Sequence, residues 1–485
     1  MNIAIIGAGL TGLTAGYRLS KLGHKVTIFE KEPFVGGLAH GFRPAPARNA
    51  PARNASQTVA GGSHSDAGGT RSTIEKWPAT RSLGEGWDWS LEAFYHHIFS
   101  NDHAIMDLVR EIGCDKELFF SRPVTATLIP NDTKLYPLDS PTGLLSFSPL
   151  SPLSRIQTGM MLAFLKANPF WQPMENLTAE RFIRSVGGTV GWHTLWEPLL
   201  YGKFGPYADK VAASWFWARI KKRTPSLGYF HGGFQTVAET LAQKIKSQGG
   251  IIHTGTTIQP IQQNTHDSSF IIPALPARFA ESRRAGGQNS KFDAVLLTVP
   301  SQIAMKLTHV LLNSLPAVRQ VKSIPHLWAQ TLILETKEPI LKNVYWLNIN
   351  DRSFPFLSMV AHTNFIDKKH YGGNHITYFG NYLPDGHEYL KMDKNQLLKI
   401  FIPFIQRINP SLILNHKSLI NSYLFTAPNA QPVHTLHYSR QAPPLHTPIP
   451  NMYLANMDSI YPWDRGTNYA VELGEKVAIA IAKNK

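Results

Sequence analysis

The chain has 485 residues, and its 48 Lys and Arg against 33 Asp and Glu give a formal net charge of +15 at pH 7. Its 43% hydrophobic content excludes a wholly disordered protein, and its length predicts about two or three domains. The single cysteine, Cys114, excludes a disulfide scaffold, a cysteine-rich zinc module and a thiolate iron–sulfur site.

No window offers about eighteen uninterrupted apolar residues, so no membrane-spanning helix is expected. Met1-Asn2 runs straight into apolar residues 3–6 without the basic region of a signal peptide, which predicts a cytoplasmic protein. The positive charge suits nucleic acid, an anionic membrane face or an acidic ligand. Because no nucleic-acid-binding module is recognisable and residues 43–82 carry a net +4, nucleic acid is not an expected partner.

The first predicted elements are a strand over residues 3–6 and a helix over residues 13–22. Between them lies the loop Gly7-Ala8-Gly9-Leu10-Thr11-Gly12. The first glycine permits a tight turn, the second lets the backbone approach a pyrophosphate, and the third lets helix and strand pack closely. The helix N-terminus offers unpaired N–H groups to phosphates. The loop predicts a dinucleotide site, with a structural glycine turn as the alternative.

A second strand is predicted over residues 25–29, and Glu30 at its end stands eighteen residues after Gly12. An acid at this distance from the glycine loop is typical of a ribose-binding carboxylate. Because a carboxylate repels a 2′-phosphate, Glu30 also argues against NADP at this site.

A second glycine pair, Gly36-Gly37, follows Glu30-Lys31 after a few residues and precedes Leu38. NAD does not require such a pair. The stretch resembles the signature of flavoproteins with two dinucleotide-binding domains, where it brings the backbone close to FAD. An ordinary glycine turn is the alternative, since Gly-Gly is a common loop marker.

Residues 44–85 interrupt the α/β pattern. The five residues PARNA occur twice in tandem there, and a stretch rich in Ser, Gly and Thr follows. Few aliphatic residues and many coil-favouring ones predict an inserted, disordered low-complexity surface loop. Residues 273–290 have a similar composition and predict a second surface excursion.

Residues 92–99 are dense in titratable and aromatic groups and contain the adjacent histidines His96 and His97. A histidine titrates near neutral pH and can move protons during oxidation of a substrate. Because adjacent residues seldom point the same way, at most one of the pair is expected to be catalytic. The alternative is a buried structural histidine beside a solvent-facing one.

Two further segments have open interpretations. Residues 144–171 are apolar and flanked by Arg155 and Lys166, so they could lie on a membrane face or open a channel for a lipid-like substrate. A buried helix of the substrate domain is the favoured interpretation. Residues 197–205 place Lys203 in a glycine-flanked aromatic loop, where a surface lysine is the alternative to a functional one.

The remaining chain continues the alternation of helices and strands. Helices are predicted over residues 235–246 and 469–482, and strands over residues 251–253, 294–299 and 453–455. Nucleotide-binding character therefore occurs at both ends of the chain and once in its middle. The stretches between are rich in Trp, Phe, Tyr and Pro.

Three of these later segments match one known superfamily in order. They are residues 232–258, residues 292–300 and residues 452–474, the last containing Asp464-Arg465-Gly466-Thr467-Asn468. With the two glycine motifs, they make the chain resemble the superfamily of FAD-dependent amine oxidases, protoporphyrinogen oxidases and phytoene desaturases. The resemblance covers nearly the whole chain except the two insertions.

The resemblance implies roles for particular residues. Ile258 would pack by the adenine, while Asp458, Gly466, Thr467 and Asn468 would complete the FAD site. Lys203 would lie near flavin N5, and Arg465 near the N1/C2=O edge. An Asp464–Arg465 contact of purely structural purpose is the alternative for that loop. The sequence departs from the motifs of this superfamily at two places. Asn456-Met457 stands where Gly-Asp is usual, and Leu38 stands where a basic residue is usual.

The expected fold is α/β, with a Rossmann-like FAD-binding domain of the two-dinucleotide-binding-domain type and an interleaved α+β substrate domain. The FAD-binding domain is assigned to residues 1–43, 225–300 and 445–485. The substrate domain is assigned to residues 86–224 and 301–444.

The expected function is an FAD-dependent oxidoreductase that oxidises an amine, a porphyrinogen or an isoprenoid-type substrate by hydride transfer. One alternative is a flavin enzyme without net redox, resembling UDP-galactopyranose mutase. Another is a flavin-free binding protein, resembling GDP-dissociation inhibitors. No metal site is expected, because the twenty histidines are scattered and no metal-ligand spacing occurs. The expected partner is a small-molecule substrate, with possible peripheral contact at the inner face of a membrane.

Overall fold

The computed structural model describes residues 1–44, 86–264, 266–276, 290–308, 324–415 and 417–483. The insertion predicted at 44–85, except for Pro44, lies outside the described residues, as do residues 277–289 of the second excursion. Within the described part, no helix is both long and apolar enough to cross a membrane.

A five-stranded parallel sheet contains strands from both ends of the chain and from its middle. Its order is β10 (Ile251–His253), β2 (Lys25–Phe29), β1 (Asn2–Ile6), β16 (Ala294–Leu297) and β22 (Met452–Leu454). Every strand predicted for the nucleotide-binding segments is thus confirmed, with bounds shifted by at most two residues. The first and last segments of the chain therefore meet within one sheet.

Both faces of this sheet are covered. Side chains alternate along a strand, so Ile3 and Ile5 of β1 pack toward the helices, while Ala4 and Ile6 pack on the opposite face. The helices are α1 (Leu10–Lys21), α2 (His103–Ile112), α9 (Phe234–Ser247) and α14 (Thr467–Lys483). The opposite face carries a small sheet of β12 (Gln262–Gln263), β13 (Phe270–Ile272) and β15 (Ser290–Phe292).

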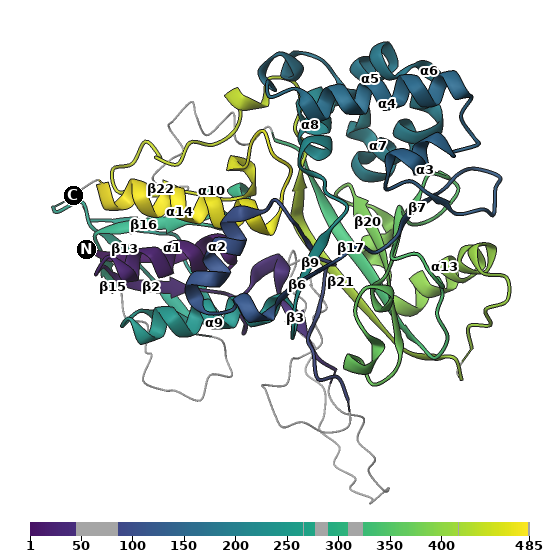
Figure 1. Ribbon diagram of the computed structural model, residues 1–485. Helices are drawn as coiled ribbons and strands as arrows, with labels where there is room; N and C mark the ends of the chain where they lie inside the picture. Colours follow the sequence, from purple (N-terminus) through teal and green to yellow (C-terminus); the bar gives the residue numbers. More distant parts are fainter. Residues whose placement is uncertain (45–85, 265, 277–289, 309–323, 416, 484–485) are drawn as a thin grey trace, which may run out of the picture.

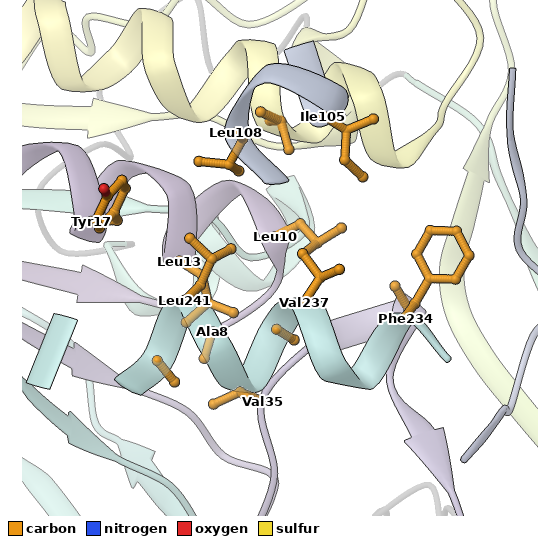
Figure 2. Packing of buried hydrophobic residues seen from close by; sticks show 14 of the residues in the cluster. Ala8, Leu10, Leu13, Tyr17, Val35, Ile105, Leu108, Phe234, Val237 and Leu241 are labelled. Atoms are coloured by element: carbon orange, nitrogen blue, oxygen red, sulfur yellow. The ribbon is translucent and has the colours of Figure 1, made fainter. Parts of the chain in front are cut away.

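The helices on the first face share one apolar core. Leu10 and Leu13 of α1 meet Val237 and Leu241 of α9, and Leu108 of α2 adds to the same cluster (Figure 2). α14 lies along α1 (Figure 1). A Cβ on Gly474 of α14 would lie 2.7 Å from the Thr11 carbonyl oxygen, so the two helices approach closely at a glycine.

The second half of the molecule is built on a seven-stranded, mostly antiparallel sheet. Its order is β21 (Leu419–Pro432), β17 (His326–Thr336), β20 (His375–Leu383), β19 (Ser358–Ala361), β18 (Trp346–Ile349), β7 (Thr125–Leu128) and β8 (Tyr136–Pro137). Helix α13 (Lys394–Ile408) packs on it through Leu397, Phe401 and Ile405. The boundaries proposed between the two domains remain a prediction.

A layer of helices lies beyond one end of this sheet (Figure 1). It consists of α3 (Pro141–Leu145), α4 (Pro152–Ala167), α5 (Ala179–Gly187), α6 (Thr189–Gly191), α7 (Glu197–Phe204) and α8 (Ala213–Lys222). Short strands connect the two halves, among them β3 (Gly41–Phe42) with β4 (Leu91–Glu92), and β5 (Ile98–Phe99), β9 (Leu227–Phe230) and β6 (Leu118–Ser121). Also present are β11 (Thr256–Ile258), β14 (Ala274–Pro276) and α10 (Ser301–Leu307).

Two expectations about this helical layer are wrong. The favoured buried helix within 144–171 is α4, and only one face of it is covered: Met161 and Leu165 are buried, while Met160 is 62% exposed. The expected loop over 197–205 is helix α7, in which Lys203 is buried. The neighbouring elements decided both cases, since an apolar or aromatic stretch does not encode which elements will cover it.

Candidate functional site

The first glycine loop closes tightly between β1 and α1. Gly7 has φ +107°, a conformation that favours glycine. A Cβ on Gly12 would lie 2.1 Å from the Gly7 carbonyl oxygen, so that position also requires glycine. Thr298 at the end of β16 donates its hydroxyl to the Gly7 carbonyl oxygen over 3.1 Å. The loop is therefore anchored on the central strands of the sheet.

The second glycine pair lies against the first loop. The Gly36 N–H donates to the Ala8 carbonyl oxygen over 2.9 Å, and a Cβ on Gly37 would lie 3.1 Å from the Gly9 Cα. Among the described residues, a Cβ on Gly9 itself would meet only the Gly37 Cα within 4 Å, at 3.9 Å, so none of their side chains fills the space beside it. Because Gly9 caps α1 without a side chain, the N–H groups of the first helical turn are available to phosphate oxygens. This backbone cradle fits a dinucleotide.

Glu30 holds the end of β2 against the same loop. Its Oε2 accepts from the Ala8 N–H at 2.8 Å and its Oε1 accepts from the Glu32 N–H at 2.9 Å. Burial raises the pKa of Glu30, although these two hydrogen bonds act in the opposite direction. Each carboxylate oxygen keeps a further lone pair, so the predicted contact with a ribose remains chemically open. The neighbouring Lys31 is exposed and pairs with Glu32 at 3.2 Å.

Two side chains of the closing segment are already engaged within the protein. Asp458 is 2% exposed, and its Oδ1 lies 2.6 Å from Nε2 of His326. The Asn468 Oδ1 accepts from the Ile105 N–H at 3.1 Å and so ties α14 to α2. Their predicted contacts with FAD remain predictions.

The other predicted cofactor residues lie as follows. Ile258 is buried in the apolar cluster that also contains Phe29 and Phe292. Thr467 and Asn468 begin α14 as buried residues, while Gly466 before them is exposed. Their roles toward FAD also remain predictions.

A narrow cavity lies where the two halves of the molecule meet. Its wall on the nucleotide-binding side comes from the residue after the second glycine pair and from the segment after β4, and its other wall comes from β17, β20 and β21. The lining residues are Leu38, Phe94, Tyr95, His96, Ala329, Gln330, Thr331, Gly380, Asn381, Tyr382, Ala430 and Arg465. The second glycine motif and the closing segment thus each contribute a wall residue, Leu38 and Arg465.

The adjacent histidines point to different surroundings. His96 lines the cavity, and its Nδ1 donates to the Phe94 carbonyl oxygen at 2.5 Å. Because a carbonyl can only accept, Nε2 of a neutral His96 carries the lone pair. Burial lowers the pKa of His96 to about 4, which keeps the ring neutral. His97 is not among the lining residues and packs instead on the rings of Phe99 and Trp346.

Arg465 and Lys203 belong to one hydrogen-bonded cluster. Lys203 Nζ donates to Asp464 Oδ2 at 2.9 Å, and the Arg465 N–H donates to Asp464 Oδ1 at 3.0 Å. The Arg465 Nε donates to Gln431 Oε1 at 2.8 Å, and its guanidinium also contacts the Tyr382 hydroxyl. Lys203 Nζ lies 5.5 Å from the centre of the Tyr382 ring, behind the cavity wall. The Asp464–Arg465 contact that was the alternative for this loop is therefore present, through the Arg465 backbone N–H, and Asp464 also binds Lys203. The predicted position of Arg465 near the flavin stays a prediction.

This cluster carries an excess of positive charge. Arg219 lies 3.9 Å from Asp464, so Lys203 and Arg219 share a single carboxylate, which Arg465 contacts through its backbone N–H. Burial, and secondarily the neighbouring arginines, lower the pKa of Lys203 to about 7. Burial alone would raise the pKa of Asp464, but Lys203 and Arg219 hold it well below its usual range. Among the described residues, no carboxylate forms a side-chain ion pair with the Arg465 guanidinium.

A buried acid stands directly before the cavity segment. Glu92 is 1% exposed, accepts from the Tyr229 hydroxyl at 2.6 Å and from the Phe234 N–H at 2.7 Å, and so caps α9. Burial raises its pKa to about 7. No cation pairs with it among the described residues.

The sequence did not predict most of the cavity residues that lie on the seven-stranded sheet. Gln330, Asn381 and Tyr382 lie on strands without any motif, and Gln431 sits at the end of a long strand. Alternation along β17 and β20 could have shown which of their side chains share a face. It could not have shown that this face meets Arg465, because the register between distant strands is a tertiary property.

Comparisons with known proteins agree with this geometry. The family model described as flavin containing amine oxidoreductase matches residues 77–482, and an NAD(P)-binding Rossmann-like domain matches residues 5–67. A solved structure of a protein provisionally named protoporphyrinogen oxidase, from Exiguobacterium sp. 255-15, has TM-score 0.70 and 15% identity, covering 100% of this chain and 99% of that one. A putrescine oxidase double mutant has TM-score 0.66 and 13% identity, with 99% of each chain covered. These two likenesses show the fold.

A curated relative matches over a short segment only. It is the 4,4'-diapophytoene desaturase (4,4'-diaponeurosporene-forming) of Staphylococcus haemolyticus, 56% identical over 43 residues. The match spans 9% of this chain and 9% of the relative.

Proposed function

The chain belongs to the family of flavin-containing amine oxidoreductases, and we propose that it oxidises a small organic substrate in the cavity between Leu38 and Arg465. It is a flavin-dependent oxidoreductase with FAD as its cofactor. The observation that carries the proposal is the meeting of the second glycine motif and the closing segment on one cavity. A flavin-free binding function is set aside, because the family is defined as flavin-containing.

Cofactor and substrate would occupy different parts of the molecule. The backbone of Gly7–Gly12 and Gly36–Gly37 would hold the dinucleotide, with Glu30 at the ribose. When bound, FAD supplies the acceptor for a hydride from a substrate C–H bond. The cavity walls then exclude water and orient the substrate between an apolar side, with Leu38, Phe94 and Ala430, and a polar side.

On the polar side of the cavity, His96 and Arg465 have different proposed roles. His96 is neutral and offers the Nε2 lone pair, so it can accept a proton or hydrogen bond from a substrate N–H or O–H. Arg465 is a cation that pairs directly with no carboxylate of the described residues, so it would stabilise negative charge that develops nearby. Lys203 acts through Asp464 as a positioning residue, because Tyr382 stands between it and the cavity.

We propose three alternative substrate classes: an amine, a porphyrinogen or an isoprenoid-type hydrocarbon. The diapophytoene desaturase segment and the putrescine oxidase fold support the isoprenoid and amine alternatives, respectively, as analogies. The apolar wall suits a hydrocarbon, and the neutral His96 suits an amine whose nitrogen must lose a proton. We also propose a cytoplasmic location with peripheral membrane contact, which an isoprenoid substrate would need.

Anaerobic flavin bleaching tests the proposal. Purified holoprotein is mixed with members of the three classes, and absorbance of the oxidised flavin is followed near 450 nm, the region in which oxidised flavins generally absorb. Bleaching by one class, with turnover restored by an added electron acceptor, supports the proposal. If no compound bleaches the flavin while dithionite does, the oxidative function is wrong.

A parallel titration addresses the mutase-like alternative. The observation that favours an anionic ligand such as a sugar nucleotide is the positive charge of this region, where Lys203 and Arg219 share Asp464 and Arg465 lines the cavity. Tight binding of UDP-sugars to the reduced holoprotein, without net oxidation, would favour that alternative. Bleaching by an organic substrate and absence of UDP-sugar binding would exclude it.

A further inference from the structure

Helix α4 presents a stripe of large apolar side chains to solvent. Leu153 is 75% exposed, Ile156 52%, Met160 62% and Phe164 51%. Their spacings of three, four and four residues place them on one face of the helix. Thr158, Met161 and Leu165 form the opposite face and are buried against α5 and α8. The helix therefore has two apolar faces, and the part of the chain that the structure describes covers one of them.

Two further apolar side chains are exposed in the segments on either side of α4. Leu145 at the end of α3 is 59% exposed, and Phe170 after the helix is 65% exposed. The sixteen residues of α4 alone extend over roughly 24 Å. We call this surface the α4 face, defined by Leu145, Leu153, Ile156, Met160, Phe164 and Phe170. A contiguous exposed apolar patch on a folded protein marks an interaction site.

The charge around the α4 face decides between its possible occupants. Residues 141–223, which form the helical layer, contain ten Lys and Arg against four Asp and Glu; without Lys203 and Arg219, which lie beside Asp464, the net charge is +4. Exposed Lys166 follows Phe164 by two residues, and its Nζ donates to the carbonyl oxygens of Ile220 and Lys221, which holds the basic end of α8 beside α4. Two copies of such a layer would repel each other, whereas an anionic surface would attract it.

We propose that the α4 face docks on the surface of a lipid bilayer that contains anionic lipids. The apolar stripe would enter the headgroup and acyl boundary, while the basic residues of α4 and α5 would remain at the headgroups. The helix would lie in the plane of the interface, since no described helix is able to cross the bilayer. This inference specifies the peripheral contact included in the proposed function. It does not depend on the flavin chemistry.

Vesicle co-sedimentation of the FAD-loaded full chain tests this docking. Large unilamellar vesicles of phosphatidylcholine alone are compared with vesicles that also contain phosphatidylglycerol, at low and at high salt. The protein is expected to bind the anionic vesicles, and more weakly as salt rises. The triple variant Ile156→Ser, Met160→Ser, Phe164→Ser should partition at least ~10-fold more weakly, because the lost side chains are those that enter the apolar boundary.

A matched control comes from exposed apolar residues elsewhere. Ile413 is 69% exposed, Ile420 42% and Ile479 54%, and none lies in the helical layer. The triple variant with serine at these three positions should bind vesicles as the wild type does. Flavin content and melting temperature should be unchanged in both variants, since all six side chains are exposed, so a loss of binding is not a loss of folding.

Three outcomes would overturn the docking proposal. The wild type could fail to bind anionic vesicles, or both triple variants could lose binding equally. Alternatively, light scattering could show a concentration-dependent dimer for the wild type and a monomer for the α4 variant, which would assign the face to a second copy of the chain. None of these outcomes would affect flavin bleaching, so docking and catalysis fail independently.

Discussion

Asp464 Oδ2 accepts a hydrogen bond from Lys203 Nζ at 2.9 Å, although 261 residues separate the two along the chain. The pair joins helix α7 of the helical layer to the loop before α14. Through its other oxygen, Asp464 accepts from the backbone N–H of Arg465, whose guanidinium lines the cavity. The charge state of Lys203 is thereby coupled to the electrostatic potential at the cavity wall.

This coupling predicts a pH dependence of flavin reduction. Lys203, with a pKa of about 7, is a cation below that pH and neutral above it. Because loss of this charge weakens the stabilisation of negative charge beside Arg465, the rate of anaerobic flavin reduction should fall as pH rises through 7. Lys203→Arg keeps its charge and should remove the fall, while Lys203→Met should give a low rate at every pH. Stopped-flow reduction from pH 5.5 to 9 measures this, and a wild-type rate that is flat or rising would refute it.

The two adjacent histidines should respond differently to the same substitution. His96→Phe removes the Nε2 lone pair from the cavity and should slow flavin reduction by about two orders of magnitude. His97→Phe should leave the rate within a few-fold of wild type, because His97 packs among rings away from the lining. Single-turnover kinetics of both variants, beside their melting temperatures, make the comparison. Equal losses of rate in well-folded variants would contradict the assignment.

Flavin retention tests the backbone cradle. Gly9→Val should give folded protein without flavin, since the new side chain meets no residue closely but occupies the space expected for the pyrophosphate. Gly159→Val in α4 is the control, because a Cβ there makes only an ordinary 3.6 Å contact with Leu144. Circular dichroism and the ratio of flavin to protein absorbance are measured for both. A Gly9→Val protein that keeps full flavin would place the cofactor elsewhere.

Glu92 should impose a pH dependence on stability. Its folded pKa of about 7 exceeds the reference value of 4.5, so the folded state holds more protons than the unfolded state between these values. The free energy of unfolding should therefore fall as pH rises from 4.5 to 7, by up to about 3 kcal/mol, and then level off. Glu92→Gln does not titrate and should flatten this dependence. Urea unfolding at pH 5, 6, 7 and 8 provides the measurement, and identical slopes in both proteins would exclude Glu92 as the source.

The nucleotide-binding helices and strands were predictable because residues close together in the chain determine them. Gly7 needs a positive φ, Gly12 admits no Cβ, and the apolar runs of β1 and β2 are short enough to be strands whatever else the chain does. The same holds for α9 and α14, whose periodicity predicted their extent within two residues at the N-terminus and one at the C-terminus. The family resemblance rested on these local motifs.

The cavity and the α4 face depended on contacts between distant segments. Nothing near Lys203 in the chain predicts that it will be buried against Asp464, and nothing in the strand of Tyr382 predicts its contact with Arg465. Likewise, α4 is apolar on both faces, so its sequence could not distinguish the covered face from the exposed one. Neighbouring residues set the backbone conformation of the glycine loops and the periodicity of the helices and strands, so these features can be predicted from the sequence. Strand register and helix packing join residues hundreds of positions apart, so the positions of the charges at the cavity and of the exposed apolar surface follow from the folded chain alone.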